Sequence, residues 1–304
     1  MNAESSRLRS TGTTSSDMRA IWAGALLVVY LSATGLLLLI GHSRAPSVGI
    51  VLHFAVLVAI AAATWLRIVP RWLRDWAPLI ALLFLYSEIP MLISAAGHTR
   101  LFDPTVMSWE QAIFRGQPAL TWAAQLRSRA LSEVLHASYL SYYGIIFSVP
   151  AGLFLAGRRA EFREAVFVLM LTYVCCFAWY VVFPVAGPRY LFLSPADRLS
   201  GPIRSTVLWL LESRSSRGTA FPSSHVAIAT TQSILALRYF RFTRGGIILA
   251  LSVGLAIGAI YGGFHYAVDV VAGAALGAVL TFAGLAISRA LPGEERQANA
   301  SAPT

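Results

Sequence analysis

The chain has 304 residues, of which 57% are hydrophobic and 12% charged, and its formal net charge is +10. A soluble domain carries about twice that charged fraction, so the composition excludes an ordinary soluble protein. It also argues against nucleic acid as a partner, because the basic residues lie in short connectors between long apolar stretches, as orientation in a membrane requires. The sequence contains no lysine, which excludes any lysine-dependent mechanism.

The chain divides into two polar tails and one long apolar region. We expect residues 1–19 to be a disordered tail, residues 20–289 to form a single transmembrane catalytic domain with its motifs in a core from about 136 to 289, and residues 290–304 to be a second polar tail. A helix needs about 20 apolar residues to cross a bilayer. The predicted fold class is therefore all-α, a polytopic helix bundle, with apolar spans at 20–41, 48–68, 76–96, 136–156, 164–185, 223–241, 246–263 and 266–288.

The arginine distribution predicts the topology. Eight spans place both tails on one side, and the short connectors on that side are rich in arginine, whereas those on the other side hold Arg44 alone. Positive residues mark the cytoplasmic side of a membrane protein. We therefore expect an integral, multi-pass protein of the plasma (inner) membrane, with both termini cytoplasmic and the long connectors 97–135 and 186–222 outside.

The first long connector predicts a helix of its own. Asp103-Pro104 is a plausible helix start, and Val106, Trp109, Ile113 and Phe114 follow at helical spacing. This pattern favours a helix that lies in the plane of the outer membrane interface. The alternative is an ordinary helix in an extramembrane loop.

Several polar residues in the apolar spans are candidates for lining a substrate cavity. Glu88 lies within the third span, where an ionisable side chain needs a polar partner or a cavity. His136, Tyr139 and Tyr143 share one helical face, and they are candidates for contacting a head group or an acceptor, as is Tyr261. The alternative for the three on one face is a plain aromatic belt at the membrane interface.

Three motif-bearing patches meet at the predicted outer face, although the spans were assigned without them. The first, residues 183–190, ends the fifth span and contains Arg189. The second, residues 218–225, precedes the sixth span and ends at His225. The third, residues 261–269, joins the last two spans. This convergence predicts a site at the outer face.

His265 and Asp269 indicate the chemistry of the third patch. Residues four apart on a helix share a face. A carboxylate can accept a hydrogen bond from one ring nitrogen and leave the other available as a base or nucleophile. A purely structural pair and half of a zinc site are the alternatives.

The other two patches supply what a phosphoryl group needs. Pro222, Ser223 and Ser224 form a good helix start, and amide groups at a helix N-terminus bind phosphate. A histidine at that position, His225, can donate a proton to a leaving oxygen. The Arg189 guanidinium can grip two phosphoryl oxygens, although an arginine that pairs with lipid head groups is the alternative.

These patches resemble the signature motifs of the type 2 phosphatidic acid phosphatase superfamily, in order and in topology. The chain is most similar to its inositolphosphotransferase branch, which includes the fungal inositol phosphorylceramide synthases, and the similarity covers about residues 80–290. The residues that carry the branch resemblance are Phe221–His225, Tyr261–Asp269, His136–Tyr143 and Asp103–Pro118.

The resemblance implies a six-helix phosphatase-type core and a role for each site residue. His265 would be the nucleophile that forms a phosphohistidine, and Asp269 would hold its orientation. His225 would protonate the leaving group and then deprotonate the incoming water or alcohol. The phosphate of a lipid substrate would be bound by Arg189, Ser223 and Ser224. No metal and no other cofactor is implied.

The sequence departs from the superfamily pattern at two positions. The lysine that begins the common first motif is missing, and Ala259 stands where the common third motif has an arginine. Phosphate binding therefore has fewer cations, unless arginines of the second long connector compensate, namely Arg198, Arg204, Arg214 and Arg217. Three functions stay open: a phosphatase or phosphotransferase, depending on the acceptor; a proton-coupled transporter that uses His225, His265 and Asp269 as a relay; and an inactive scaffold.

Overall fold

The computed structural model describes residues 15–66, 69–192, 201–214 and 216–290. The described residues are overwhelmingly helical and contain no strand, apart from one isolated parallel bridge between Val185 and Thr219. This confirms the predicted all-α class. The longer helices are α1 (Ser15–Ile40), α2 (Ser47–Trp65), α3 (Arg71–Ala95), α8 (Arg159–Val182), α11 (Ser224–Tyr239), α12 (Phe242–Tyr261) and α13 (Ala267–Ala290), and the shorter ones are α4 (Asp103–Phe114), α5 (Pro118–Gln125), α6 (Arg129–Leu140), α7 (Tyr142–Leu155), α9 (Pro188–Leu191) and α10 (Pro202–Arg214).

Seven helical segments among the described residues are long and apolar enough to cross a membrane, and they indicate a multi-pass membrane protein. Eight spans were expected. The difference is α11, which has 16 residues where 223–241 was predicted, and 16 residues rise only about 24 Å. The predicted span 136–156 lies within the segment Arg129–Leu155, in which α6 and α7 are joined at Ser141.

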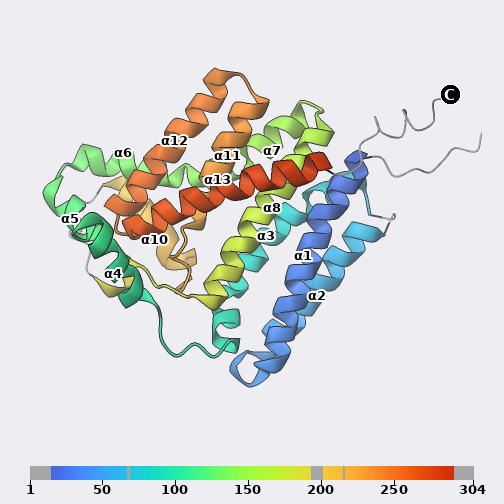
Figure 1. The fold of residues 1–304 in the computed structure, drawn as a ribbon, viewed down its shortest axis with the longest axis horizontal. Helices are drawn as coiled ribbons and strands as arrows, with labels where there is room; N and C mark the ends of the chain where they lie inside the picture. Colours follow the sequence, from blue (N-terminus) through green and yellow to red (C-terminus); the bar gives the residue numbers. More distant parts are fainter. Residues whose placement is uncertain (1–14, 67–68, 193–200, 215, 291–304) are drawn as a thin grey trace, which may run out of the picture.

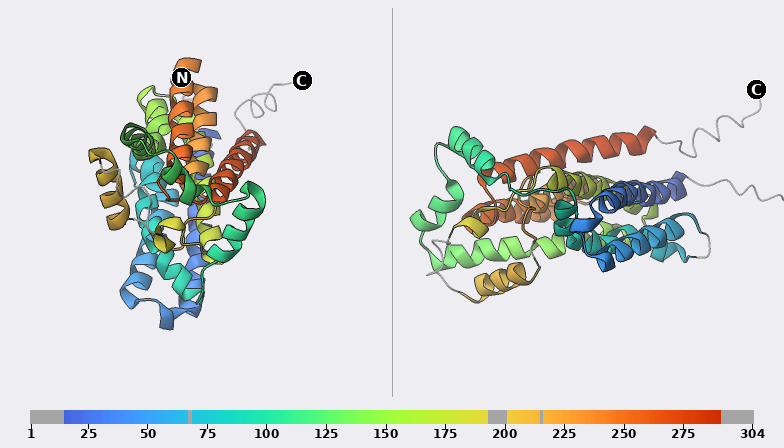
Figure 2. Two further views of the ribbon diagram at one scale, coloured as in Figure 1. Left: turned by 90° about the vertical axis from the view of Figure 1, so that its left-hand side faces the viewer. Right: turned by 90° about the horizontal axis from the view of Figure 1, so that it is seen from below.

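The ends of the bundle differ in character (Figures 1 and 2). The first residue of α1 and the last residue of α13 lie at one end. The helices α4, α5 and α10 gather at the opposite end, where α13 begins. The two long connectors thus form a cap of short helices over one end of the bundle.

Small residues let the helices that carry the motifs approach closely. A side chain at Gly273 would collide with the Ser223 carbonyl, and one at Gly277 would collide with the Ala227 carbonyl, so α13 lies directly against the backbone of α11. Deeper in the core, the Thr231 hydroxyl accepts a hydrogen bond from Thr281 at 3.0 Å and lies 3.3 Å from the Thr172 hydroxyl. These contacts fix α8, α11 and α13 relative to one another.

The three N-terminal helices form a group that α8 connects to the rest. α1 packs on α2, α3 and α8, and its buried side chains include Leu27 and Leu31. Between α3 and α8, the Arg163 Nε donates to Asp75 at 2.9 Å, and both side chains are buried. A buried arginine is tolerated there because a carboxylate compensates its charge.

The cap helix α4 inverts the usual amphipathic arrangement. Its buried residues are Asp103, Val106 and Glu110, while Trp109, Ile113 and Phe114 are exposed. The predicted helix is confirmed, and its exposed apolar side is what an interfacial helix presents to lipid. Its placement in the membrane interface stays a prediction.

Candidate active site

The three motif-bearing patches come together at the end of the bundle covered by the cap. His225 lies at the start of α11, and His265 lies in the turn between α12 and α13. Their ring centroids are 5.8 Å apart. The short parallel bridge connects the first patch to the second, since Ala220 donates its amide to the Val185 carbonyl at 2.9 Å. Residues far apart in sequence therefore share one site.

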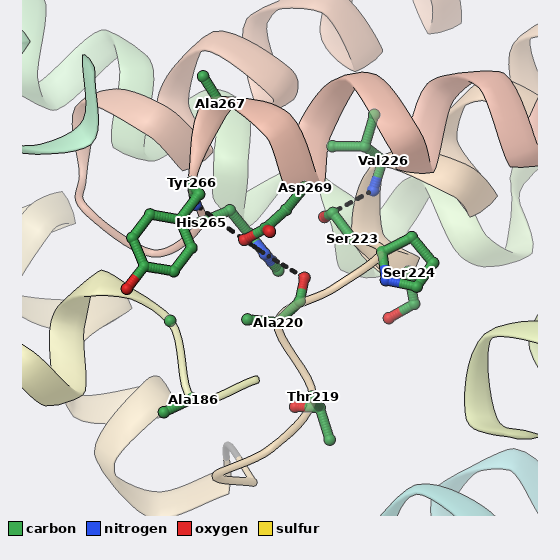
Figure 3. Close-up of polar contacts among 12 residues, drawn as sticks. Ala186, Thr219, Ala220, Ser223, Ser224, Val226, His265, Tyr266, Ala267 and Asp269 are labelled. Atoms are coloured by element: carbon green, nitrogen blue, oxygen red, sulfur yellow. Dashed lines mark hydrogen bonds and ion pairs between the residues drawn. The ribbon is translucent and has the colours of Figure 1, made fainter. Parts of the chain in front are cut away.

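The tautomer of His265 follows from its partners (Figure 3). Its Nδ1 lies 3.0 Å from the Ala220 carbonyl and 3.5 Å from the Asp269 Oδ2. A carbonyl oxygen only accepts hydrogen bonds, so Nδ1 must carry the proton. The Nε2 of His265 makes no hydrogen bond with the described residues and has a free lone pair. The ring is thus oriented as a nucleophile requires.

Asp269 is fully buried and fixes the turn as well as the ring. Its Oδ2 accepts the Tyr266 amide at 2.8 Å, and its backbone carbonyl accepts the Ser223 amide at 3.0 Å. The Oδ1 atom has no hydrogen-bond partner among the described residues. Asp269 therefore holds His265 and joins the start of α11 to the start of α13.

His225 lies between aromatic rings. Tyr139 stacks on it with centroids 5.3 Å apart, and Tyr142 packs on it at 4.3 Å. Its Nδ1 is buried and has no hydrogen-bond partner among the described residues. The ring is held by packing rather than by a carboxylate, and burial together with the neighbouring His265 lowers the pKa of His225 to about 3.

The helix start at Ser223 differs from the expectation of free amide groups. The Ser223 amide donates to Asp269, and the Ser224 amide donates to the Tyr180 hydroxyl at 3.0 Å. The Ser223 hydroxyl caps the helix by accepting from the Val226 amide at 3.4 Å. What remains for a ligand is the Ser224 hydroxyl and the His225 amide, for which no hydrogen bond exists within the described residues.

Arg189 enters the site from α9. Its guanidinium carbon lies 4.8 Å from the centroid of the Tyr190 ring, and it interacts electrostatically with the Tyr139 hydroxyl. Its Nη1 is buried and has no hydrogen-bond partner among the described residues. Tyr139 also stacks on His225, so Arg189 lies on the side of the site that this tyrosine lines.

A second polar cluster adjoins the site behind Phe264. The His136 ring lies 5.6 Å from Phe264 and 6.5 Å from Tyr261, and its Nε2 is buried without a hydrogen-bond partner among the described residues. Arg204 interacts electrostatically with both His136 and Tyr261, and only 3% of it is exposed. Glu133 holds it there by accepting the Ile203 and Arg204 amides.

Of the arginines that could compensate, Arg204 is therefore brought close to His136, one of the predicted cavity residues. Arg217 lies in the turn before Gly218. Arg198 and the side chain of Arg214 lie outside the described residues.

Two candidates for lining the cavity lie elsewhere or face outward. The Glu88 carboxylate lies 2.9 Å from His53 Nδ1, inside the N-terminal group of helices. Glu88 therefore has a polar partner, which was one of the two alternatives expected for it, and it does not lie at the histidine site. Tyr143 is 50% exposed, because Ser141 interrupts the helix and turns Tyr142 toward His225 in its place. Its hydroxyl still interacts with that of Tyr139.

Four residues that the sequence analysis assigned no role contribute to the site. Tyr142 packs on His225, and Tyr180 bridges the Pro222 carbonyl and the Ser224 amide. Asp103 and Glu110 accept backbone hydrogen bonds from the first and third patches. A signal for the last two was present, since they lie seven residues apart on the same helical face as Val106.

Among the described residues, no three side chains of His, Cys, Asp or Glu are grouped so that they could hold a metal ion. The chemistry that the described site offers is that of two imidazoles, one carboxylate and one guanidinium. This set fits the transfer of an anionic group between a nitrogen nucleophile and oxygen acceptors.

Comparison with known proteins identifies the family. A model described as the PAP2 superfamily matches residues 104–283, which is more than half of the chain and includes all three patches. The match does not reach the level of the inositolphosphotransferase branch, which stays a prediction. No curated protein and no solved structure matches the chain. The PAP2 superfamily typically comprises phosphatases, and the extent of the match shows that this chain belongs to that superfamily, which supports a phosphatase-type function on lipid phosphates.

Proposed function

We propose that the protein cleaves phosphate esters of lipids at the outer face of the plasma membrane, through a phosphohistidine on His265. The observation that carries this proposal is the meeting of His225 and His265 at 5.8 Å from separate helices. The Asp269 carboxylate lies 3.5 Å from His265 Nδ1. Arg189 interacts with Tyr139, which stacks on His225. A histidine that meets a second histidine across an anion-binding site is suited to covalent phosphoryl transfer.

In the first step, His265 Nε2 attacks the phosphorus atom and a nitrogen–phosphorus bond forms. The bond between phosphorus and the lipid oxygen breaks, and His225 gives that oxygen a proton that it takes up when the substrate binds, because the negative charge of the phosphate favours the protonated ring. Nδ1 keeps its proton and its bond to Ala220, and Asp269 stabilises the positive charge that develops on the ring. The lipid leaves as an alcohol.

In the second step, His225 takes a proton from an incoming water molecule. The water oxygen attacks phosphorus, the nitrogen–phosphorus bond breaks, and inorganic phosphate leaves. His265 regains its lone pair, and His225 is again protonated. Arg189, the Ser224 hydroxyl and the His225 amide would bind the equatorial oxygens, which carry the spread charge in both transition states. This role for the hydroxyl of Ser224 replaces the set of free amides first expected.

The membrane orientation is supported by two independent observations. The short connectors rich in arginine lie on the side of the chain ends, which predicts that side to be cytoplasmic. The site lies at the other end of the bundle, under the cap of short helices. A substrate head group would therefore be bound at the outer leaflet.

Transfer to a second alcohol in place of water is the alternative. The cluster of His136, Tyr261 and Arg204 favours it, because these buried polar side chains lie one aromatic layer away from the two histidines. The His136 Nε2 among them is buried and has no hydrogen-bond partner among the described residues, so it is suited to binding a hydroxyl or phosphate group of a head group. Such a subsite would place an acceptor alcohol beside the phosphohistidine.

The experiment uses the purified protein in detergent with labelled phosphatidate, isoprenyl phosphates, phosphatidylinositol and ceramide, alone and in combination, with and without chelator. Phosphate release that is lost in His265→Ala and kept in His42→Ala, an exposed histidine, supports the phosphatase. Label on a second lipid supports the transferase. Label that becomes bound to the wild-type protein in an acid-labile, base-stable form supports the phosphohistidine. Absence of turnover on every substrate, together with proton-coupled flux in vesicles, would overturn the proposal in favour of a transporter.

A further inference from the structure

The cap helix α4 carries two buried carboxylates, and each accepts hydrogen bonds from backbone amides of the site. Asp103 is 3% exposed and Glu110 is 0% exposed, although α4 belongs to the cap and not to the membrane-spanning bundle. Burying a carboxylate is energetically costly, because its charge loses the surrounding water, unless hydrogen bonds compensate the loss. Two buried carboxylates on one face of a short helix are therefore expected to have a structural or functional role.

Asp103 binds the loop that precedes Arg189. Its Oδ2 accepts the Ala186 amide at 2.8 Å, and its Oδ1 accepts the Gly187 amide at 2.9 Å. Gly187 has a φ of +93°, and a side chain there would crowd Ala220 and the Phe264 carbonyl. The loop therefore has a conformation that only glycine adopts readily, and its two hydrogen bonds to the Asp103 carboxylate hold it there.

The same carboxylate reaches the third patch. Tyr266, the residue after His265, donates its hydroxyl to the Asp103 Oδ1 at 3.2 Å. Seven residues further along α4, the Glu110 Oε1 accepts the amide of Ala267 at 3.1 Å, and Ala267 is the first residue of α13. Helix α4 thus binds both the loop that precedes Arg189 and the turn that carries His265.

The amides at the start of α13 are divided between two carboxylates. Tyr266 donates its amide to Asp269, and Ala267 donates to Glu110. The Glu110 Oε2 is buried and has no hydrogen-bond partner among the described residues. The titratable groups that face Glu110 are Asp269 and Tyr266, with Asp103 on its own helix and His265 immediately before Tyr266.

We propose that Asp103 and Glu110 are positioning residues: they make α4 a clamp that fixes Arg189 relative to His265 and Asp269, and Glu110 makes the activity of the site depend on pH. The activity measurements below rest on the proposed function, while the exchange measurements do not. A misplacement of about 1 Å between reacting groups can cost about 100-fold in rate, so a clamp of this kind has a direct effect on catalysis.

The pH dependence has a definite sign. Burial raises the pKa of Glu110 to about 7, the bond from Ala267 opposes this, and the charge of Asp269 adds to it. Below about pH 7 Glu110 is neutral and adds no charge to the site. Above about pH 7 its negative charge repels the phosphate dianion. We therefore expect kcat/KM to fall as the pH rises through the pKa of Glu110.

The clamp is tested by amide hydrogen exchange in the full chain, followed over residues 185–190 and 265–270. We expect Asp103→Asn to speed exchange at Ala186 and Gly187, and Glu110→Ala to speed it at Ala267, each by about tenfold or more, because each variant removes about 1.4 kcal/mol of local protection. Gln111→Ala, on the exposed side of the same helix, is the matched control and should change neither segment. Unchanged exchange in both variants would overturn the clamp.

The pH effect is tested with Glu110→Gln, which keeps an acceptor for the Ala267 amide but cannot ionise. We expect this variant to fold, to retain activity at pH 6, and to lose the fall in kcat/KM that the wild type shows above about pH 7. A pH profile that overlays that of the wild type would overturn the role of Glu110. If the wild type hydrolyses no lipid phosphate, the proposed function fails, and the exchange data still decide whether α4 is a clamp.

Discussion

Two buried histidines in this chain pair with carboxylates, His53 with Glu88 between α2 and α3, and His265 with Asp269 at the start of α13. The side chains of both pairs are almost fully buried. They differ in what the second ring nitrogen does. His53 uses Nδ1 for Glu88 and Nε2 for the Leu31 carbonyl at 2.8 Å, whereas His265 directs Nδ1 to Ala220 and Asp269 and leaves Nε2 free.

The comparison teaches that a carboxylate alone does not make a histidine reactive. Both ring nitrogens of His53 are held in hydrogen bonds, one to Glu88 and one to the Leu31 carbonyl, so neither is free to react and the ring connects helices α1, α2 and α3. The ring of His265 is fixed by one nitrogen, and its centroid lies 5.8 Å from that of a second imidazole. Only the second arrangement leaves a ring nitrogen free beside a second imidazole, as the proposed pair of nucleophile and proton donor requires.

The largest expected effect separates the two histidines directly. Replacing His265 with glutamine removes the proposed nucleophile, and we expect phosphate release to fall by about 1,000-fold or more. His53→Gln should stay within about fivefold of the wild type per folded molecule, since this residue touches no reacting atom. The measurement is initial rate per unit of monodisperse protein. Equal losses in the two variants would contradict the distinction between the pairs.

The next effect concerns what His225 adds. We expect His225→Gln to slow hydrolysis of alkyl phosphates by about 100- to 10,000-fold, because the leaving alkoxide is no longer protonated. With 4-nitrophenyl phosphate the loss in the first step should be much smaller, since nitrophenolate leaves without a proton. A release of nitrophenolate in a single burst, followed by slow turnover, is the expected pattern. An equal loss on both substrates throughout would show that His225 is not the proton donor.

A smaller effect is expected for the structural pair. Glu88→Gln leaves His53 with a weaker, uncharged partner in the core, and we expect it to reduce the free energy of unfolding by about 1–3 kcal/mol. Reversible unfolding in mixed detergent measures this, with Glu212→Gln, an exposed glutamate of α10, as the control. Activity per folded molecule should be unchanged. A loss of activity without a loss of stability would place Glu88 at the site after all.

The two pairs also show what the sequence could and could not predict. His265 and Asp269 are four residues apart on one helix, so their pairing follows from helical geometry. His53 and Glu88 are 35 residues apart on separate helices, and no local pattern connects them. The same holds for Asp103, whose partners are more than 80 residues away. Its role became visible only when the first and third patches had been placed side by side.

The remaining differences have local causes. The apolar spans followed from composition, because the bilayer imposes length and hydropathy on each helix. The break at Ser141 did not, since nothing in the run of aromatic and small residues around it is a helix breaker, and it exchanged Tyr143 for Tyr142 at His225. The filled amides at Ser223 and Ser224 depend on Asp269 and Tyr180, which arrive from other helices.

The smallest expected effect concerns hydroxyl contacts in the core. It tests whether they contribute as much to the free energy of unfolding as the pair of His53 and Glu88 does, or less. Thr231→Val replaces the hydroxyl that Thr281 donates to and that lies beside Thr172, and we expect a loss of about 0.6 kcal/mol in the same unfolding assay, as is typical of hydroxyl contacts between membrane helices. Thr231→Ser keeps the hydroxyl and loses only a methyl group, so it separates the hydrogen bonds from packing. A loss in Thr231→Val as large as that in Glu88→Gln would contradict this expectation. Hydrogen bonds between α8, α11 and α13 would then stabilise the protein as much as the ionisable pair of the N-terminal helices does. The two regions would differ in their chemistry and not in their contribution to stability.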